Sequence, residues 1–368
     1  MNFHLTPEER AFQTRVRAYL QEVSEDWSIP RSDEEYQARA RTVREGLGER
    51  GWLTINWGPP YGPASPIKAA ILQEEMAYHL VPRANDHGTD LAGPLLLRHG
   101  AAEQRGLHLA PLAEGREWWC VGFTEPLAGS DLANIRTRAE FRDGGFVLNG
   151  QKDYGEWAQA SGWCHLLART ERGSTGREGL TWFLLDMSTP GIFLNPVEYT
   201  TDRVFAEIFL DDVPAPESAI LGERGRGWDL VDEFLTRART GFEHVGWARR
   251  MLDLAVEHRG RGGGRRARLA EASVDIEVAR LLSYRSIWPG RGGEQARRRA
   301  STAKLFSSEV FQRVADTTMN MMGLQGQGTG RLVQSLYLEA AASSIYLGPS
   351  EVHRTLISGL TTSGLKPA

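Results

Sequence analysis

The sequence predicts an α+β protein with a helical N-terminal domain, a middle β domain and a C-terminal helical bundle. Two changes in the spacing of apolar residues support this prediction. Apolar residues recur at helical spacing up to about residue 115, alternate with polar residues from Trp118 onward, and return to helical spacing after Trp228. We therefore expect domains over residues 1–115, 116–222 and 223–368.

A capping signal opens the N-terminal domain. Thr6 supplies a capping hydroxyl, Pro7 suits the first helical turn, and Glu9 completes a capping box before an apolar stripe. The other segments of this domain with helical signals are 45–53, 66–79, 90–99 and 101–113. The first domain is therefore expected to be helical.

Apolar and polar residues alternate in the middle domain, whereas apolar stripes at helical spacing mark the last domain. Strands are expected around residues 147–148, 165–167, 181–185 and 206–210. One apolar stripe at helical spacing runs over residues 231–255, and further helices are expected over 268–288, 300–322, 331–346 and 350–360. We expect these helices to pack as an antiparallel bundle.

The composition is that of a globular protein. The 368 residues include 41% apolar and 24% charged ones, which suits two or three packed units, and a net charge of -4 argues against nonspecific nucleic-acid binding. Cys120 and Cys164 are too few for a disulfide framework, and their apolar neighbours predict buried thiols in a reducing cytoplasm. No basic and apolar leader opens the chain, and no run of about 18 apolar residues occurs, so we expect a soluble protein without a membrane span. No metal site is expected.

An uninterrupted series of motifs runs from Thr124 to Arg169. It begins with Phe123-Thr124-Glu125-Pro126-Leu127-Ala128-Gly129-Ser130-Asp131, where small residues, backbone donors and a hydroxyl would let a planar ligand approach closely. It continues through residues 137–152 and 166–170. These motifs resemble the middle domain of the acyl-CoA dehydrogenase family, which is a small β-barrel.

The resemblance implies a cofactor and a reaction. In this family a glutamate removes the α-proton of an acyl thioester, while the β-hydrogen leaves as a hydride to N5 of FAD. The residues implied to bind the flavin are Phe123, Thr124, Gly129, Ser130, Tyr154 and Glu156. The residues implied to bind the substrate are Ser130, Arg239, Phe242, Leu347 and Gly348. Tyr154 stands where the family usually stacks a tryptophan on the flavin, and tyrosine can keep that contact.

The main departure from the family concerns its catalytic glutamate. One branch of the family carries this residue after Ile-Tyr near the C-terminus, and here that position is Leu347. Another branch carries it before a helical arginine, and here that position is Ala238. Neither side chain can accept a proton, so the base is displaced or absent.

Two further departures concern FAD. Glu156 replaces a threonine that meets the flavin, so its carboxylate would lower the flavin potential or exclude the ring; alternatively, it turns outward to pair with an arginine. The segment that usually holds the ADP half is shortened to an Arg- and Gly-rich run over 259–266, and a later glycine motif is altered over 320–326. This run could cradle a diphosphate, but a solvated turn is the simpler interpretation.

The candidates for the missing acid-base chemistry are Glu156, Glu243, His87 and Asp90. His87 lies between Asp86 and Asp90, and a carboxylate can orient an imidazole that titrates near neutrality. Glu243 lies one turn after Arg239 and could reach the same site. Each candidate has a simpler alternative as a helix cap, an ion pair or a solvent-facing group.

Three functions remain open. The first is a flavin-dependent oxidoreductase that acts on an acyl thioester of CoA or of a carrier protein, with a displaced base. The second is a family member repurposed for non-redox acid-base chemistry on an acyl-like or polyketide-like substrate, with weak or no FAD binding. The third is a noncatalytic partner in a heteromeric dehydrogenase. Because the family assembles through its C-terminal bundle, we expect a homodimer or a dimer of dimers, or a heteromer with a homologue.

Overall fold

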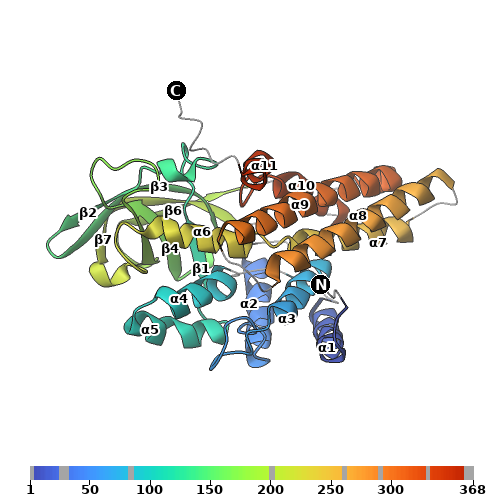
Figure 1. Ribbon diagram of the computed structural model, residues 1–368, viewed down its shortest axis with the longest axis horizontal. Helices are drawn as coiled ribbons and strands as arrows, with labels where there is room; N and C mark the ends of the chain where they lie inside the picture. Colours follow the sequence, from blue (N-terminus) through green and yellow to red (C-terminus); the bar gives the residue numbers. More distant parts are fainter. Residues whose placement is uncertain are drawn as a thin grey trace. The chain divides into compact units, whose positions relative to one another are not determined.

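The computed structural model describes residues 4–24, 33–81, 87–198, 204–258, 263–288, 293–328 and 332–359 (Figure 1). Packing divides the chain into two compact units, each built from segments that are far apart in the sequence. Unit 1 comprises residues 1–32, 65–83 and 236–368, and unit 2 comprises residues 33–64 and 84–235. Helices, then strands, then helices follow one another along the chain, so the predicted α+β class is confirmed.

Unit 2 is built on a β-sheet. The strands in its described part are β1 (Trp119–Gly122), β2 (Arg138–Arg142), β3 (Gly145–Glu156), β4 (Trp163–Arg169), β5 (Leu180–Asp186), β6 (Ile192–Val197) and β7 (Phe205–Pro216). Their order is β1-β4-β2-β3-β7-β6, with β5 paired to β4. The long strands β3 and β7 form an antiparallel ladder (Figure 1). This ladder carries the stretch of β3 that holds Tyr154 and Glu156.

Because apolar and polar residues alternate along the strands, apolar side chains fill the core of this sheet. The buried side chains of the core include Ala139, Phe146, Leu148, Leu166, Phe183, Leu185, Ala206, Ile208, Leu210 and Val213. Cys120 and Cys164 stand opposite each other in the parallel ladder of β1 and β4, and both are buried, as predicted. The hydrogen bond between the two thiols and their burial raise the pKa of Cys120, so this thiol stays protonated near neutral pH.

Unit 2 also contains helices. They are α2 (Asp33–Glu49), α4 (Gly93–His99), α5 (Ala102–Ala113) and most of α6 (Gly227–Ala238). The predicted helix over 90–99 is an α-helix only from Gly93, because a π-helical turn, η1 (His87–Ala92), precedes it. Such turns are often found at functional sites. The turn packs against β1 and so brings His87 to the sheet.

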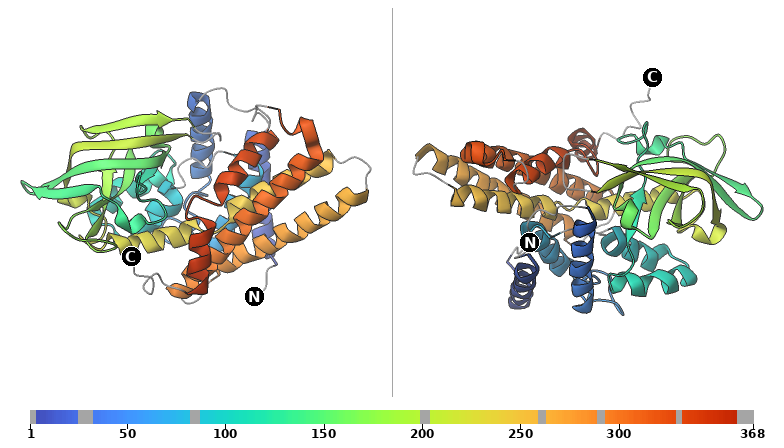
Figure 2. Two further views of the ribbon diagram at one scale, coloured as in Figure 1. Left: turned by 90° about the horizontal axis from the view of Figure 1, so that it is seen from above. Right: turned by 180° about the vertical axis from the view of Figure 1, so that it is seen from behind.

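Unit 1 is a helical bundle. Its helices in the described residues are α1 (Pro7–Ser24), α3 (Pro66–Tyr78), α7 (Phe242–Glu257), α8 (Gly263–Ile287), α9 (Glu294–Met322), α10 (Leu332–Ser343) and α11 (Ser350–Ser358). The long helices α8 and α9 lie side by side, and α7 packs against both (Figure 2). The predicted capping box of α1 is present, since Thr6 and Glu9 exchange backbone-to-side-chain hydrogen bonds of 2.7 and 3.2 Å.

One predicted helix is interrupted. The apolar stripe over 231–255 continues through two helices, α6 and α7, and not through a single one. Gly241 caps α7 with a φ of 80°, in the left-handed region that favours glycine. A Cβ atom at this position would lie only 2.5 Å from Ser307 Oγ. Hydrophobic spacing alone could not reveal this break, because the stripe keeps its phase across it.

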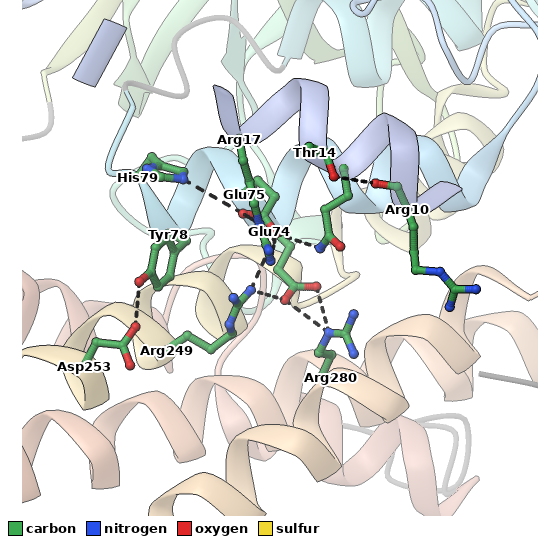
Figure 3. Close-up of polar contacts among 11 residues, drawn as sticks. Arg10, Thr14, Arg17, Glu74, Glu75, Tyr78, His79, Arg249, Asp253 and Arg280 are labelled. Carbon is green, nitrogen blue, oxygen red and sulfur yellow. Dashed lines mark hydrogen bonds and ion pairs between the residues drawn. The ribbon is translucent and has the colours of Figure 1, made fainter. Parts of the chain in front are cut away.

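Two buried carboxylates join four helices of unit 1 (Figure 3). The Glu74 and Glu75 side chains of α3 are each 1% exposed. Glu74 accepts hydrogen bonds from Arg249 of α7 at 2.5 Å and from Arg280 of α8 at 3.1 Å. Glu75 accepts two from Arg17 of α1, at 2.8 and 2.9 Å. This network therefore holds α1, α7 and α8 to α3.

Glu74→Ala is expected to lower the free energy of unfolding of the full chain by about 3–5 kcal/mol, because it leaves Arg280 without its buried partner and Arg249 with only the more distant Glu75 carboxylate, 3.9 Å away. The control is Asp275→Ala, which removes an exposed ion pair with Arg313 at 2.7 Å and should cost about 1 kcal/mol or less. Urea unfolding followed by circular dichroism measures both variants. Equal losses would contradict a special role for the network.

No helix in the described ranges is long and apolar enough to cross a membrane. The same ranges hold no group of three or more histidine, cysteine, aspartate or glutamate side chains arranged to bind a metal ion.

Candidate functional site

A buried ion pair fixes the loop that follows β1. Lys152 of β3 is fully buried, and its Nζ lies 2.7 Å from Glu125 Oε1 and 3.2 Å from Phe123 O. Glu125 also accepts a hydrogen bond of 2.9 Å from the backbone N–H of Thr137. A second backbone N–H, that of Arg136, donates to its other oxygen. One carboxylate therefore joins both ends of the loop to β3.

Glu125 remains ionised in this site. Burial by itself raises the pKa of a carboxyl group, but the Lys152 ammonium and the hydrogen bonds from Lys152, Thr137 and Arg136 outweigh burial and lower the pKa of Glu125. Its interactions therefore stabilise the fold at pH values above the usual pKa range of carboxyl groups. This stabilisation is lost as the pH falls through the lowered pKa of Glu125.

The residues that the resemblance assigns to a flavin lie on this loop and on the adjoining part of β3. The backbone N–H of Asp153 donates to Thr124 O at 2.8 Å and joins the two stretches. A bulge between Lys152 and Gly155 places Tyr154 in the left-handed region, with a φ of 57°. The Tyr154 side chain is 55% exposed. An aromatic face is therefore presented beside the loop.

The loop itself is open to a ligand. Gly129 and Ser130 are exposed, and Thr124 is half-buried. A Cβ added to Gly129 would meet no atom closer than Thr124 Cγ2 at 3.8 Å. Phe123, in contrast, is buried edge-on against Trp182 and supports the loop from within. The hydroxyls, the exposed backbone and the Tyr154 ring fit an isoalloxazine, so the residues present in unit 2 suit a flavin.

Glu156, the last residue of β3, faces a histidine. His87 Nε2 lies 3.7 Å from Glu156 Oε2, and the two side chains are 21% and 23% exposed. Each residue is a candidate on sequence grounds, but with Asp86 or Asp90 as the partner of His87. The structure instead brings His87 of η1 to Glu156 of β3. Asp86 lies outside the described residues, and Asp90 is half-buried in η1.

An aromatic side chain lies over one face of the His87 imidazole. The ring stacks on Phe234 of α6, with centroids 6.4 Å apart and planes 24° apart. Phe234 in turn packs against Phe123 and Trp182. The Nδ1 atom of His87 is buried and has no hydrogen-bond partner within the described residues. One ring nitrogen thus faces a carboxylate, while the other is uncommitted in largely apolar surroundings.

A chain of hydrogen bonds holds the backbone of His87. The indole N–H of Trp182 can only donate, and it donates to His165 Nδ1 at 3.1 Å. His165 Nε2 must therefore carry the proton, which it donates to His87 O at 3.3 Å. Burial and the neighbouring histidines lower the pKa of His165 to about 3, so its ring stays neutral. This support was not predicted, because strand alternation does not show which side chains meet across a sheet.

In unit 1, the two family positions for the base come together. Arg239, directly after Ala238, donates from Nε to Leu347 O at 2.7 Å. Leu347 has a left-handed backbone with a φ of 56°, and Gly348 follows with a φ of 104°. Lys304 Nζ donates to Gly348 O at 2.9 Å. Arg239 and Lys304 therefore hold the loop that carries Leu347.

The surroundings of Leu347 combine one permanent cation, Arg239, with two bases of lowered pKa. Burial and the Arg239 charge lower the pKa of Lys304 to about 7. Burial and the charges of Arg239 and Lys304 lower the pKa of His353 to about 3. Neither Lys304 nor His353 is a candidate on sequence grounds, because each comes from a helix whose pattern indicates only packing. A carboxylate introduced at position 347 would enter a region of positive potential.

The remaining predicted residues lie at the start of α7. Phe242 is 1% exposed and packs edge-on against Tyr284, so it belongs to the core of unit 1. Glu243 is half-buried in the first turn. Their roles toward a substrate stay predictions. Residues 259–262 of the Arg- and Gly-rich run lie outside the described residues, and the altered glycine motif forms the end of α9 and a 3-10 turn over Gly323–Gln325.

Family comparisons cover nearly the whole chain. The descriptions "Acyl-CoA dehydrogenase, N-terminal domain", "middle domain" and "C-terminal domain" match residues 6–116, 120–213 and 225–359. The chain belongs to the acyl-CoA dehydrogenase family. The resemblance carried by the middle-domain motifs therefore extends to the helical parts on either side.

Individual relatives agree with this assignment. Acyl-CoA dehydrogenase IpdE1 of Mycolicibacterium smegmatis is 29% identical over 354 residues, which cover 89% of this chain and 88% of that protein. An acyl-CoA dehydrogenase structure from Geobacillus kaustophilus has a TM-score of 0.85 at 24% identity, covering 98% of this chain and 99% of that one. The ChsE4-ChsE5 complex from Mycobacterium tuberculosis gives a TM-score of 0.83 at 24% identity, covering 100% of each chain. The structural likenesses confirm the predicted fold.

Lys152→Met is expected to destabilise the chain by about 3–5 kcal/mol, because it leaves the Glu125 carboxylate buried without its cation. The double variant Glu125→Gln, Lys152→Met removes both charges and should recover a large part of that loss. Urea unfolding at neutral pH measures both variants. A double variant no more stable than Lys152→Met alone would show that the two charges do not act as a pair.

Proposed function

We propose that this chain is a flavin-dependent oxidoreductase of the acyl-CoA dehydrogenase type, acting on an acyl thioester with a base outside both usual family positions. The observation that carries this proposal is the Arg239–Leu347 hydrogen bond of 2.7 Å. It runs from Arg239, the residue after one family position, to the backbone of Leu347 at the other, and neither Leu347 nor Ala238 can accept a proton. The scaffold for the reaction is therefore kept while its usual base is missing.

The loop and β3 supply the cofactor contacts in this proposal. Thr124, Ser130 and Tyr154 would hold the flavin, and the hydrogen bond from the Asp153 N–H to Thr124 O joins the loop to β3. When bound, FAD would supply the acceptor for the hydride that leaves the substrate. The residues of the chain orient the acyl group, exclude water and move the α-proton. We favour a CoA thioester as substrate, because the relative IpdE1 is described as an acyl-CoA dehydrogenase.

A noncatalytic role in a heteromeric dehydrogenase is the second candidate. The aliphatic residues at both base positions favour it, as does the likeness to a structure described as a ChsE4-ChsE5 complex. Co-expression with a homologue followed by size-exclusion chromatography separates the two functions. A stable complex of unlike chains supports the second candidate, and a homodimer or dimer of dimers that binds FAD supports the first.

Wild-type protein is expected to dehydrogenate butyryl-CoA and octanoyl-CoA weakly or not at all, because loss of a general base costs about 10²–10⁴-fold in rate. Leu347→Glu should raise the rate, since it restores a carboxylate at a family position beside Arg239. The loss of visible flavin absorbance after addition of acyl-CoA measures both proteins. Leu347→Gln is the matched control, because glutamine has the shape of glutamate but accepts no proton.

Two results would count against this proposal. Wild-type turnover at rates ordinary for the family would show that another group serves fully as the base, and would contradict the expected weak activity. A colourless protein that takes up no FAD on reconstitution would contradict the flavin-dependent function.

A further inference from the structure

We propose that the outer face of β6, β7 and β3 in unit 2 is a docking surface for the Arg- and Gly-rich run of a second copy of this chain. The face presents the carboxylates of Asp153 and Glu207 beside aromatic side chains. The run, residues 259–266, carries four arginines. The contact concerns assembly, so it goes beyond the proposed function and needs no bound flavin.

Two paired strands place the aromatic side chains of this face. β6 and β7 pair without a shift in register, and Phe193 stands opposite Phe209. Ile208 and Leu210, on either side of Phe209, are buried in the core of the sheet, so Phe209 points to the outer face. Phe209 is half-buried, whereas Phe193 is 59% exposed. The outer face therefore presents an aromatic ring to the solvent.

Amide groups join two carboxylates on the same face. Asn195 of β6 stands opposite Glu207 of β7, two residues along the ladder from the two phenylalanines, and its Nδ2 donates to Glu207 Oε2 at 2.7 Å. Gln151 of β3 donates from Nε2 to Glu207 Oε1 at 3.4 Å and to Asp153 Oδ1 at 3.2 Å. Because Gln151 contacts both groups directly, both carboxylates lie on the outer face.

The charge of these carboxylates is not balanced on the face itself. In the described part of the chain, Asp153 and Glu207 accept hydrogen bonds from neutral amides, and neither forms an ion pair. Burial and the neighbouring charge of Glu207 raise the pKa of Asp153. Two half-buried carboxylates that repel each other favour the approach of a cation, because the cation relieves that repulsion.

Arginine is the cation that suits this face. Its guanidinium group is planar, stacks on aromatic rings and donates several hydrogen bonds to carboxylates. The run supplies this chemistry, since four of its eight residues are arginines and the other four are glycines. Glycine-rich segments adapt readily to a surface. The charges of the run and of the face are therefore complementary, as in specific interfaces.

A second copy can bring its run to the face in a suitable orientation. Within one copy, the run is held at both ends, because α7 ends at Glu257, α8 begins at Gly263, and these two helices pack against each other. Two copies related by a two-fold axis would make the contact twice, once in each direction, and so form a closed dimer. This reciprocity is the reason for assigning the run to a second copy.

Disulfide trapping between two variants of the full chain tests the contact. Asn195→Cys places a thiol on the face, Gly262→Cys places one in the run, and the native Cys120 and Cys164 are buried. One variant carries ¹⁵N, so mass spectrometry identifies the mixed dimer after mild oxidation. The matched control is Leu107→Cys, which places a thiol at an exposed position of α5 in the same unit. Its yield of mixed dimer should be lower by about tenfold.

The cross-link should also depend on the two carboxylates. Asp153→Asn together with Glu207→Gln, added to the Asn195→Cys chain, should lower the yield by about tenfold. The same two substitutions in the Leu107→Cys chain should leave its yield unchanged. Thermal melting of each variant shows whether the fold is intact.

Four outcomes would overturn the docking surface: equal yields from the Asn195→Cys and Leu107→Cys chains, a yield that is insensitive to the carboxylates, a disulfide between two Asn195→Cys chains in place of the mixed product, or closure within one copy of a chain that carries both cysteines. The proposed function fails separately, because the uptake of FAD and its bleaching by acyl-CoA do not enter this experiment.

Discussion

The ion pair between Glu125 and Lys152 is the constraint on which the middle of the chain depends. A fully buried ammonium is costly unless it is paired and hydrogen-bonded, and Lys152 meets this condition through Glu125 and the Phe123 carbonyl. The same carboxylate accepts two backbone N–H groups at the far end of the loop. Because this one cluster fixes the loop against β3, the exposed loop residues and the bulge at Tyr154 can remain open without losing their geometry.

A similar use of buried cations occurs in unit 1. Arg239 and Lys304 hold the carbonyls of Leu347 and Gly348, and they do so although no carboxylate stands at position 347. In the proposed function, these contacts are kept although neither position 238 nor position 347 carries a carboxylate. Such a chain can serve as a partner subunit, or it can use another proton acceptor. The loop and strand residues that suit a flavin favour the second possibility.

The spacing of apolar residues predicted the order of helices and strands, because the burial of one face of a helix or strand depends only on how its apolar residues are spaced. It missed the break at Gly241, where a left-handed glycine interrupts a stripe that keeps its phase. His87 and Glu156 were each identifiable as ionisable groups near the motifs. Their pairing was not, because it depends on a π-turn and a strand bulge, and neither has a periodic signature. Lys304 was missed for a related reason, since a helix pattern does not show which polar residue is buried against another helix.

A crystal structure with a bound, non-reacting thioether analogue of an acyl-CoA tests the central claim most directly, because it shows which ionisable group faces the α-carbon. We expect the α-carbon to lie about 3–3.5 Å, the usual separation of reacting atoms, from an ionisable side chain at neither position 238 nor position 347. An α-carbon that faces no such side chain would contradict this account.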